Sequence, residues 1–502
     1  MTCRYRPSRR GRPVAVDLDG TTLDPATIAL LARARDTPRL TAGARERILR
    51  SHDWAVRASA ERPVYGRSTG VGANRQLSVT DPGAHALALL RSHATTAGPV
   101  RSPERVRAML VVRLNQLAAG GSGATLGLAE SLEAMLIDDT LPTAIGEYGS
   151  VGTGDLSALA TAGLALQGES PTSGPLRRRW AFGTHDVLPF LSSNAGVIGD
   201  AALALADLEM LCRAYLVTTA LTFTALGGND EAFAGVVERA TPFPGAATCC
   251  RALRALTAGS PAPRRIQDPF GVRTVPQAHG SCLDALTNLA CVVRGMANAP
   301  AENPVLAAAP TASGPTEAAA AEMAGEIAHH GAFHASYLAL AADSAAIGIA
   351  GSAQLISARL AALIDPVLTG LPAFLSDGTA GRSGVMVVEY VAASALGRIR
   401  AAATPAALQT VVLSRGVEED ASFASLAATS LLDIVEPFRV LLACELLCAH
   451  RAVTLAGLST ENPLLARALE LCASLPVDPQ DHDLSNEISA AGGLLPALAA
   501  LI

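Results

Sequence analysis

Apolar residues at helical spacing dominate the chain, most strongly in its second half. Apolar side chains recur there every three to four residues, which is typical of helices that bury one face or more. Helices are predicted over 24–60, 124–138, 197–226, 278–296, 316–330, 335–362, 385–402 and 421–459. A short strand and turn are predicted over 13–24. Gly- and Pro-rich loops are predicted over 65–76, 118–124, 140–157, 166–188, 256–276 and 368–384.

The distribution of these elements predicts the domain organisation. Loops gather in the first half of the chain and long helices in the second, which indicates a mainly α protein. We predict a disordered basic tail over 1–12, a mixed N-terminal domain over 13–210 and a helical domain over 211–502.

Composition narrows the possible partners. Half of the residues are hydrophobic and only 17% are charged, which favours burial of apolar faces between subunits. The net charge of −6 argues against a nucleic-acid-binding surface. The most apolar run, 346–368, is interrupted by Arg359 and Asp365, so no membrane span is predicted. No apolar segment follows the Arg-rich start, so we expect a cytoplasmic protein.

Two residue types exclude further classes of chemistry. The nine cysteines show no metal-ligand spacing and are predicted to be buried thiols, with no metal site. The chain contains no lysine, which excludes a pyridoxal-phosphate Schiff base and a Walker-type phosphate loop.

The segment Val16–Thr21 is similar to the nucleophile loop of haloacid-dehalogenase-type phosphatases. That mechanism also needs a cation, usually lysine, and a doubly wound sheet that the helical second half does not predict. The simpler interpretation is an Asp-Gly turn between a strand and a helix.

Several separate segments together resemble one family, the aromatic amino acid ammonia-lyases. Residues Tyr65–Gly72 resemble the Tyr-Gly-x-x-Thr-Gly-x-Gly loop of histidine and phenylalanine ammonia-lyases, and Gln267–Arg273 is close to their Gln-Asp-x-Tyr-Ser-x-Arg signature. Further matches, in chain order, are Arg91–Ala94, Arg113–Asn115 with Gly120–Gly123, Pro276-Gln277 with Gly280, Glu302–Pro304, Phe333-His334 and Glu418–Asp420. The resemblance covers roughly 15–460.

The resemblance implies a fold and an assembly. The fold would be the ammonia-lyase (fumarase/aspartase-like) fold, with a mixed N-terminal domain and a long central helical bundle. The protein would be a homotetramer of dihedral symmetry in which each active site draws on three chains. Its small-molecule partner would be an amino acid or an analogue of one.

The family makes its electrophile, a methylidene-imidazolone (MIO) ring, from its own Ala-Ser-Gly backbone. Here Gly149–Leu156 reads Gly-Ser-Val-Gly-Thr-Gly-Asp-Leu, one residue shorter than the family's Gly-Ser-Val-Gly-Ala-Ser-Gly-Asp-Leu. The triad would become Gly152, Thr153 and Gly154, and dehydration of Thr153 would give a methyl-substituted ring. Alternatively, the shortened loop does not reach cyclisation geometry and no ring forms.

The resemblance also assigns catalytic roles to individual residues. Tyr65 aligns with the tyrosine that removes the β-proton, a role that needs a lowered phenol pKa such as basic neighbours can provide. Arg273 aligns with the arginine that binds the substrate carboxylate. Asn194 and Glu419 align with residues near the electrophile and the amino group. Ordinary structural roles stay open: a loop aromatic for Tyr65, a surface ion pair for Arg273 and a helix-start carboxylate for Glu419.

The remaining aligned positions concern substrate choice. His93 matches a selectivity position and would favour a polar ring such as imidazole or phenol, although a lone histidine is often a core residue. Phe333 would line the aromatic pocket and Gln277 would lie near the electrophile. The sequence departs from the family at Phe270, where a tyrosine hydroxyl is lost. It departs again at Glu418, which replaces a glutamine, and at Ala421, which replaces a histidine.

Two functions follow from the resemblance. The first is an ammonia-lyase or aminomutase-like enzyme that acts on an aromatic or imidazole amino acid through a ring formed from Thr153. The second keeps the fold without the ring, as a repurposed enzyme of specialised metabolism or as an inactive paralogue that binds a small molecule or a partner.

Overall fold

The structure is a computed structural model that describes residues 14–34, 36–307 and 326–502. The basic tail predicted over 1–12 lies outside these residues, as does most of the helix predicted over 316–330. The end of that predicted helix is wrong, because Glu326–Ala328 form a strand, β6, that pairs antiparallel with β5 (Val305–Ala307). Cross-strand hydrogen bonding has overridden the helical preference of an Ala-rich sequence.

The chain folds into two compact units, each made of three stretches of sequence. Unit 1 comprises Met1–Leu203, Val292–Ala339 and Ala407–Leu426, and unit 2 comprises Ala204–Cys291, Leu340–Ala406 and Ala427–Ile502. The sequence predicts a single boundary near residue 210, whereas the units alternate along the chain.

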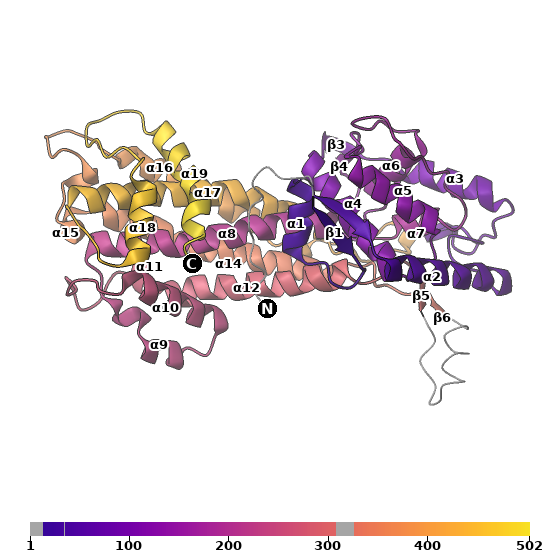
Figure 1. Cartoon of the computed structure of the whole chain (residues 1–502), viewed down its shortest axis with the longest axis horizontal. Helices are drawn as coiled ribbons and strands as arrows, with labels where there is room; N and C mark the ends of the chain where they lie inside the picture. The colour runs from indigo at the N-terminus through magenta and orange to yellow at the C-terminus, as the bar shows by residue number, and fades with distance from the viewer. Residues whose placement is uncertain (1–13, 35, 308–325) are drawn as a thin grey trace. The chain divides into compact units, whose positions relative to one another are not determined.

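Unit 1 combines short helices with paired strands (Figure 1). In its described part, β1 pairs with β2 in parallel, whereas β3–β4 and β5–β6 are antiparallel. Besides β5 and β6, its elements are β1 (Ala15–Leu18), α1 (Pro25–Arg33), β2 (Thr37–Leu40), α2 (Ala42–Glu61), η1 (Gly72–Asn74), α3 (Pro82–His93), β3 (Ala97–Val100), α4 (Pro103–Ala119), α5 (Leu126–Ile137), β4 (Gly146–Tyr148), α6 (Leu156–Gln167), α7 (Val187–Leu191) and η5 (Ser414–Gly416).

The helix predicted over 24–60 is interrupted by β2. Asp24 caps α1 by accepting a hydrogen bond from the Thr27 N–H, and α1 ends at Arg33. Pro38 lacks the N–H that a helix interior needs, and Thr37–Leu40 instead pair with β1. The period of apolar residues alone did not reveal this strand.

The Asp-Gly segment after β1 is a structural turn. Asp19 accepts hydrogen bonds from the N–H groups of Thr21 and Thr22 at 2.8 and 2.9 Å. Gly20, at a φ of 77°, packs so closely on α4 that a Cβ would overlap the backbone of Ala119. Its N–H donates to Asn115 at 3.0 Å. These contacts support the turn rather than the phosphatase loop.

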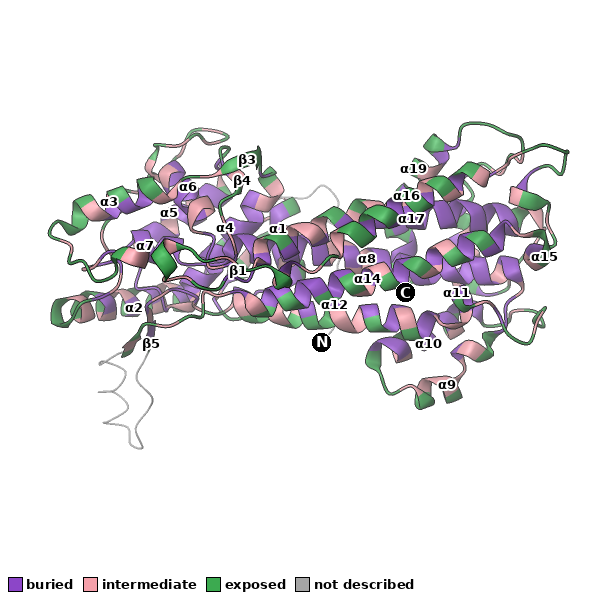
Figure 2. Cartoon of the chain, turned by 180° about the vertical axis from the view of Figure 1, so that it is seen from behind, coloured by how far each residue is buried: buried purple, intermediate pink, exposed green. Residues whose placement is uncertain are grey.

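Unit 2 is built from helices, four of which are long and contribute residues to both units. Helices α8, α12, α14 and α17 run alongside one another, and Figure 2 shows α8 and α17 buried over much of their length. Their bounds are α8 (Ala195–Leu226), α12 (Val275–Ala297), α14 (Ser336–Leu363) and α17 (Ala424–Leu455). The other elements here are η2 (Asp230–Phe233), α9 (Gly235–Ala240), α10 (Pro244–Thr257), α11 (Phe270–Arg273), α15 (Pro366–Thr369), η3 (Ala373–Leu375), α16 (Met386–Ala402), η4 (Ala406–Leu408), α18 (Pro463–Cys472) and α19 (Ser485–Ala499).

The long helices predicted from apolar spacing are confirmed. The ranges 197–226, 278–296, 335–362, 385–402 and 421–459 correspond to α8, α12, α14, α16 and α17. Most described residues lie in helices, so the predicted mainly α class is also confirmed. Long apolar helices of this kind are stabilised by packing against one another.

A buried ionic network joins the long helices inside unit 2. Arg359 of α14 donates to both carboxylate oxygens of Glu445 of α17 at 2.6 and 2.8 Å, and both side chains are fully buried. The same guanidinium donates to the Tyr215 hydroxyl on α8 at 2.9 Å and to the Gly271 carbonyl oxygen at 3.0 Å. The ring of His279, on α12, stacks on Tyr215 with a centroid distance of 3.9 Å. The network therefore links all four helices.

Helix α14 (Ser336–Leu363) is the one described helix that is long and apolar enough to cross a membrane. Half of its most apolar window is buried within the fold, and its Arg359 is paired with Glu445. Core helices pass the same test of length and composition, so α14 is weak evidence for a membrane span.

Candidate active site

Tyr65 lies half-buried in the loop between α2 and η1 of unit 1. Its hydroxyl oxygen accepts a hydrogen bond from the Gly72 N–H at 2.8 Å, and its own N–H donates to Nε2 of His329 at 3.2 Å. The next residue, Gly66, has a φ of 68°, and a Cβ there would overlap the side chain of Leu188. The glycine that follows Tyr65 in the family-like motif is therefore required by a tight turn.

The surroundings of Tyr65 raise the pKa of its phenol. Burial is the largest cause and the negative charge of Glu418 adds to it, while the Gly72 N–H and Arg75 act in the opposite direction. The lowered pKa expected from the sequence is therefore not found within this chain. Burial outweighs the charge of Arg75, and the Glu418 carboxylate comes from a segment far away in the sequence.

A buried arginine anchors the Tyr65 loop. Arg67 is 2% exposed and donates to the Ser122 carbonyl oxygen at 2.9 Å, while its other terminal nitrogen lies 2.7 Å from Nδ1 of His185. Burial lowers the pKa of Arg67 to about 10, and the charge of Asp186 partly offsets this effect. This role of Arg67 could not be predicted from the sequence, because its partners come from two other loops.

The Gly152–Thr153–Gly154 triad forms a tight loop between β4 and α6. Gly152 and Gly154 are buried, with φ of 87° and 106°, and Thr153 between them is half-buried. A Cβ at Gly152 would come within 2.1 Å of the Ser422 hydroxyl oxygen. Both glycines are therefore needed for this backbone path.

Asn194 lies directly before α8 and is fully buried. Its side-chain nitrogen donates to the carbonyl oxygen of Phe333 at 2.5 Å, and its Oδ1 has no hydrogen-bond partner among the described residues. The preceding Ser193 carbonyl accepts from the Asp155 N–H at 2.7 Å, directly after the triad. Asn194 is thus placed beside the triad with a free acceptor atom.

The Arg113 motif and the Glu302 motif contact each other in unit 1. Arg113 donates to Glu302 at 2.7 Å, and both side chains are buried. The same guanidinium donates to the carbonyl oxygens of Pro189 and, at 3.1 Å, Phe190. These bonds hold helix α7, which ends at Leu191, three residues before Asn194.

One segment, residues 413–425, connects the Tyr65 loop to the triad. Near its start, the Ser414 hydroxyl oxygen accepts from the Ala73 N–H at 3.0 Å. Near its end, the Phe423 N–H donates to the Val151 carbonyl oxygen at 2.8 Å. Tyr65 and the triad are therefore held by the same short stretch of unit 1.

The other predicted residues of unit 1 are less buried than Asn194. Nδ1 of His93 lies 3.0 Å from the Leu89 carbonyl oxygen and 3.1 Å from the Ser92 hydroxyl oxygen. Burial lowers the pKa of His93, against the effects of Leu89 and Glu418. Phe333 is half-buried, Glu419 is exposed, and its neighbour Glu418 is half-buried.

Three predicted residues, Phe270, Arg273 and Gln277, belong to unit 2. The Arg273 guanidinium lies 4.6 Å from the centroid of the Phe270 ring, and Phe270 is 64% exposed. Nε of Arg273 is buried without a hydrogen-bond partner among the described residues. Gln277 is exposed on α12. These three residues therefore belong to a different unit from Tyr65, Asn194 and the triad.

The unit 1 residues fit a backbone-derived ring. Two of the three triad residues are glycines, which have no Cβ. Beside the triad, the buried Oδ1 of Asn194 has no hydrogen-bond partner among the described residues. Gly152, Thr153 and Gly154 would hold the ring, and the half-buried Thr153 side chain would supply its exocyclic carbon.

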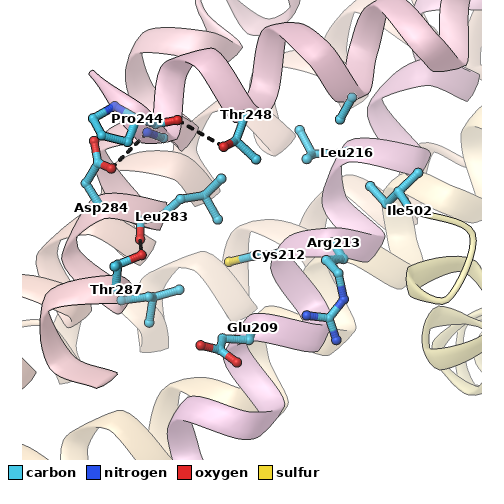
Figure 3. A pocket seen from close by; sticks show the side chains of 13 residues that line it. Glu209, Cys212, Arg213, Leu216, Pro244, Thr248, Leu283, Asp284, Thr287 and Ile502 are labelled. Carbon is cyan, nitrogen blue, oxygen red and sulfur yellow. Dashed lines mark hydrogen bonds between the residues drawn. The ribbon is translucent and has the colours of Figure 1, made fainter. Parts of the chain in front are cut away.

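Unit 2 contains a hollow of about 430 Å³ that includes none of the predicted residues (Figure 3). Its Asp284 accepts from the Gly245 N–H, and the Thr248 hydroxyl donates to Pro244 within its own helix. Cys212 on its wall lies close to His279 and Cys282. Both ring nitrogens of His279 already have hydrogen-bond partners, the Ser352 hydroxyl and the Cys212 carbonyl oxygen. We therefore interpret Cys212, His279 and Cys282 as packed core residues.

Comparison with known proteins gives consistent matches over nearly the whole chain. The family model of the aromatic amino acid lyases matches residues 23–474. The histidine ammonia-lyase of Symbiobacterium thermophilum is 31% identical over 465 residues, covering 88% of this chain and 89% of the relative. The histidine ammonia-lyase of Sorangium cellulosum is 30% identical over 516 residues, covering 97% and 96%. The structure of ergothionase from Treponema denticola has a TM-score of 0.86 at 22% identity, covering 97% of this chain and 99% of that one.

Proposed function

This chain belongs to the aromatic amino acid lyase family and is a carbon–nitrogen lyase, and from that premise we propose that it eliminates ammonia from a histidine-like or tyrosine-like L-amino acid. The reaction removes a proton from Cβ, uses that electron pair to form the Cα–Cβ double bond, and breaks the Cα–N bond to release ammonia. The observation that carries the proposal is that residues 413–425 hold both Tyr65 and the triad within unit 1.

Tyr65 is the proposed base for the Cβ proton. Its hydroxyl oxygen already accepts one N–H donor, Gly72, and that bond stabilises the phenolate that must form. Asn194 would orient the substrate amino group through its unpartnered Oδ1. A ring built from the triad would supply an electrophile that captures the amine and makes it a better leaving group.

The remaining proposed roles concern substrate recognition. The ring of the half-buried His93 would bond to a polar side-chain ring, which favours an imidazole or phenol substrate. Arg273 would bind the carboxylate through its planar fork, consistent with its unpartnered Nε. Phe333, Gln277 and Glu419 would line the rest of the pocket. Phe270, 64% exposed, would provide an apolar wall beside Arg273 in place of a hydroxyl.

We also propose a cytoplasmic homotetramer in which another chain supplies Arg273. Arg273 lies in unit 2 while Tyr65 and the triad lie in unit 1, and apolar α-helical faces favour subunit packing. The eight cysteines in the described part of the chain are free thiols, consistent with a reducing compartment. Sedimentation should give a tetramer; a stable monomer would contradict the shared site.

The proposed activity is tested with the purified chain and three substrates. Histidine, tyrosine and phenylalanine are supplied separately, and the unsaturated acid and released ammonia are measured together. Intact mass spectrometry on the same sample should show a deficit of two water molecules if the ring has formed. The proposal would be overturned if the chain showed no mass deficit and gave no product from any of the three amino acids.

Replacing Glu418 with glutamine is expected to shift the pH profile. Loss of this negative charge removes one cause of the raised Tyr65 pKa, so the phenolate forms at lower pH. The rising limb of kcat/KM should therefore move to lower pH. Glu436→Gln, which changes an exposed carboxylate on α17, serves as the charge-matched control. An unmoved limb in E418Q would show that Tyr65 is not the group that titrates.

A further inference from the structure

The carbonyl oxygen of Gly152 receives two hydrogen bonds from separate segments of unit 1. The Ala335 N–H donates to it at 3.1 Å and the Ser422 hydroxyl at 2.9 Å. A carbonyl oxygen has two lone pairs, so both are engaged by protein donors. These bonds draw electron density from the Gly152 carbonyl carbon, the atom that ring formation would attack.

The Ser422 hydroxyl is oriented for donation. The Ala424 N–H lies 3.4 Å from the hydroxyl oxygen, which leaves the hydroxyl proton for Gly152. Ser422 is only 6% exposed, and a hydrogen bond in a site of low dielectric constant is electrostatically stronger than one in water.

The approach of Ser422 depends on a departure from the family's triad. The family's triad begins with alanine, whereas the loop of this chain is one residue shorter and its triad begins with Gly152. A Cβ at Gly152 would lie 2.1 Å from the Ser422 oxygen. Real Cβ atoms do not come so close to an oxygen, so the hydroxyl reaches the carbonyl only because position 152 is glycine. The shortened triad and this serine thus form one local arrangement.

We propose that Ser422 and the Ala335 N–H form an oxyanion hole for closure of a ring in the Gly152–Thr153–Gly154 triad. The inference rests on the proposed function, because it concerns the step that makes the electrophile. Preorganised donors at such distances stabilise the negative charge that develops on an attacked carbonyl oxygen. Ser422 would thereby compensate for the shorter loop.

The chemistry of ring closure is balanced without an oxidant or a second reactant. The Gly154 amide nitrogen bonds to the Gly152 carbonyl carbon, and the carbonyl electron pair moves to the oxygen that faces Ser422 and Ala335. A proton passes in net terms from that nitrogen to that oxygen, which becomes a hydroxyl. The hydroxyl then leaves as water with the Thr153 amide proton, as a C=N bond forms between the Gly152 carbon and the Thr153 nitrogen. Loss of the Thr153 hydroxyl and its Cα proton releases the second water and forms the C=C bond.

The test follows the intact mass of freshly synthesised chain over time in Ser422→Ala and in a matched control, Ser425→Ala. The Ser425 hydroxyl donates to the Ser150 carbonyl oxygen of the same loop at 2.8 Å. Removal of one oxyanion-hole donor costs about 10²-fold or more in rate. S422A should therefore lose its two waters on the order of a hundredfold more slowly than the wild type, and S425A at a near wild-type rate.

The outcomes separate this inference from the proposed function. A wild-type chain that never loses two waters would overturn both. A wild type and an S422A variant that lose them at equal rates would overturn the oxyanion hole alone. If S422A loses its helical circular dichroism, the variant Ser422→Cys tests the inference instead. A thiol is similar in size to the hydroxyl but is a weaker hydrogen-bond donor. S422C should close more slowly than the wild type, and an equal rate would again overturn the inference.

Discussion

A Tyr65→Phe variant should lose between about 10²- and 10⁴-fold in kcat, the range expected when a positioned general base is removed. Phenylalanine keeps the ring of this half-buried residue and deletes only the hydroxyl. The Gly72 N–H then loses its partner, which costs about 1 kcal/mol of folding stability and does not by itself unfold the protein. Steady-state rates with the accepted amino acid measure the effect.

Intact mass and a second tyrosine separate catalysis from structure in this experiment. The triad lies outside the hydrogen bonds of Tyr65, so Y65F should show the same loss of water as the wild type. Tyr390→Phe changes a tyrosine that is 68% exposed on α16, and its kcat should be unchanged. A Y65F enzyme within threefold of the wild-type kcat would remove Tyr65 from the mechanism.

The parts of the fold that were predictable share one property. Helices α8, α14 and α17 repeat their apolar spacing over many turns, and a long repeat outweighs local exceptions. Strands β2 and β6 were missed because each is only three or four residues long and is fixed by pairing with a strand elsewhere in the chain. Short segments carry too little periodicity to reveal such pairing.

The candidate site was predictable only where a motif marked it. Tyr65, Asn194 and the triad occur in family-like segments, and the structure places them in one unit. Ser422 was missed, because its role depends on a hydroxyl that meets a carbonyl far away in sequence. The direction of the Tyr65 pKa was misjudged for a similar reason, since Glu418 reaches the phenol only through folding.

The division of the predicted residues between two units also has a physical origin. One sequence motif on α11 and α12 contains Phe270, Arg273 and Gln277. The motif can be recognised from the sequence, but its location in the fold cannot. Their placement depends on Gly271, whose carbonyl oxygen is held by Arg359. The structure thereby connects a sequence motif to a buried network that the motif does not include.

Replacing Arg359 with methionine is expected to lower the free energy of unfolding by about 3–5 kcal/mol, since it leaves the fully buried Glu445 carboxylate without its cation. The Tyr215 hydroxyl and the Gly271 carbonyl lose a donor as well. Chemical denaturation followed by circular dichroism measures the loss. Because Gly271 lies two residues before Arg273, substrate KM should rise in the surviving folded enzyme.

Adding Glu445→Gln to Arg359→Met should recover part of the lost stability, because the double variant no longer buries an unpaired charge. The Thr222 hydroxyl, which donates to Glu445 at 2.7 Å, retains an acceptor in the glutamine carbonyl. Arg467→Met is the matched control, since Arg467 forms an exposed pair with Glu470, and such pairs contribute about 1 kcal/mol or less. If R359M and R467M were equally stable, or the double variant were no more stable than R359M, the Arg359–Glu445 pair would not be what holds α14 against α17.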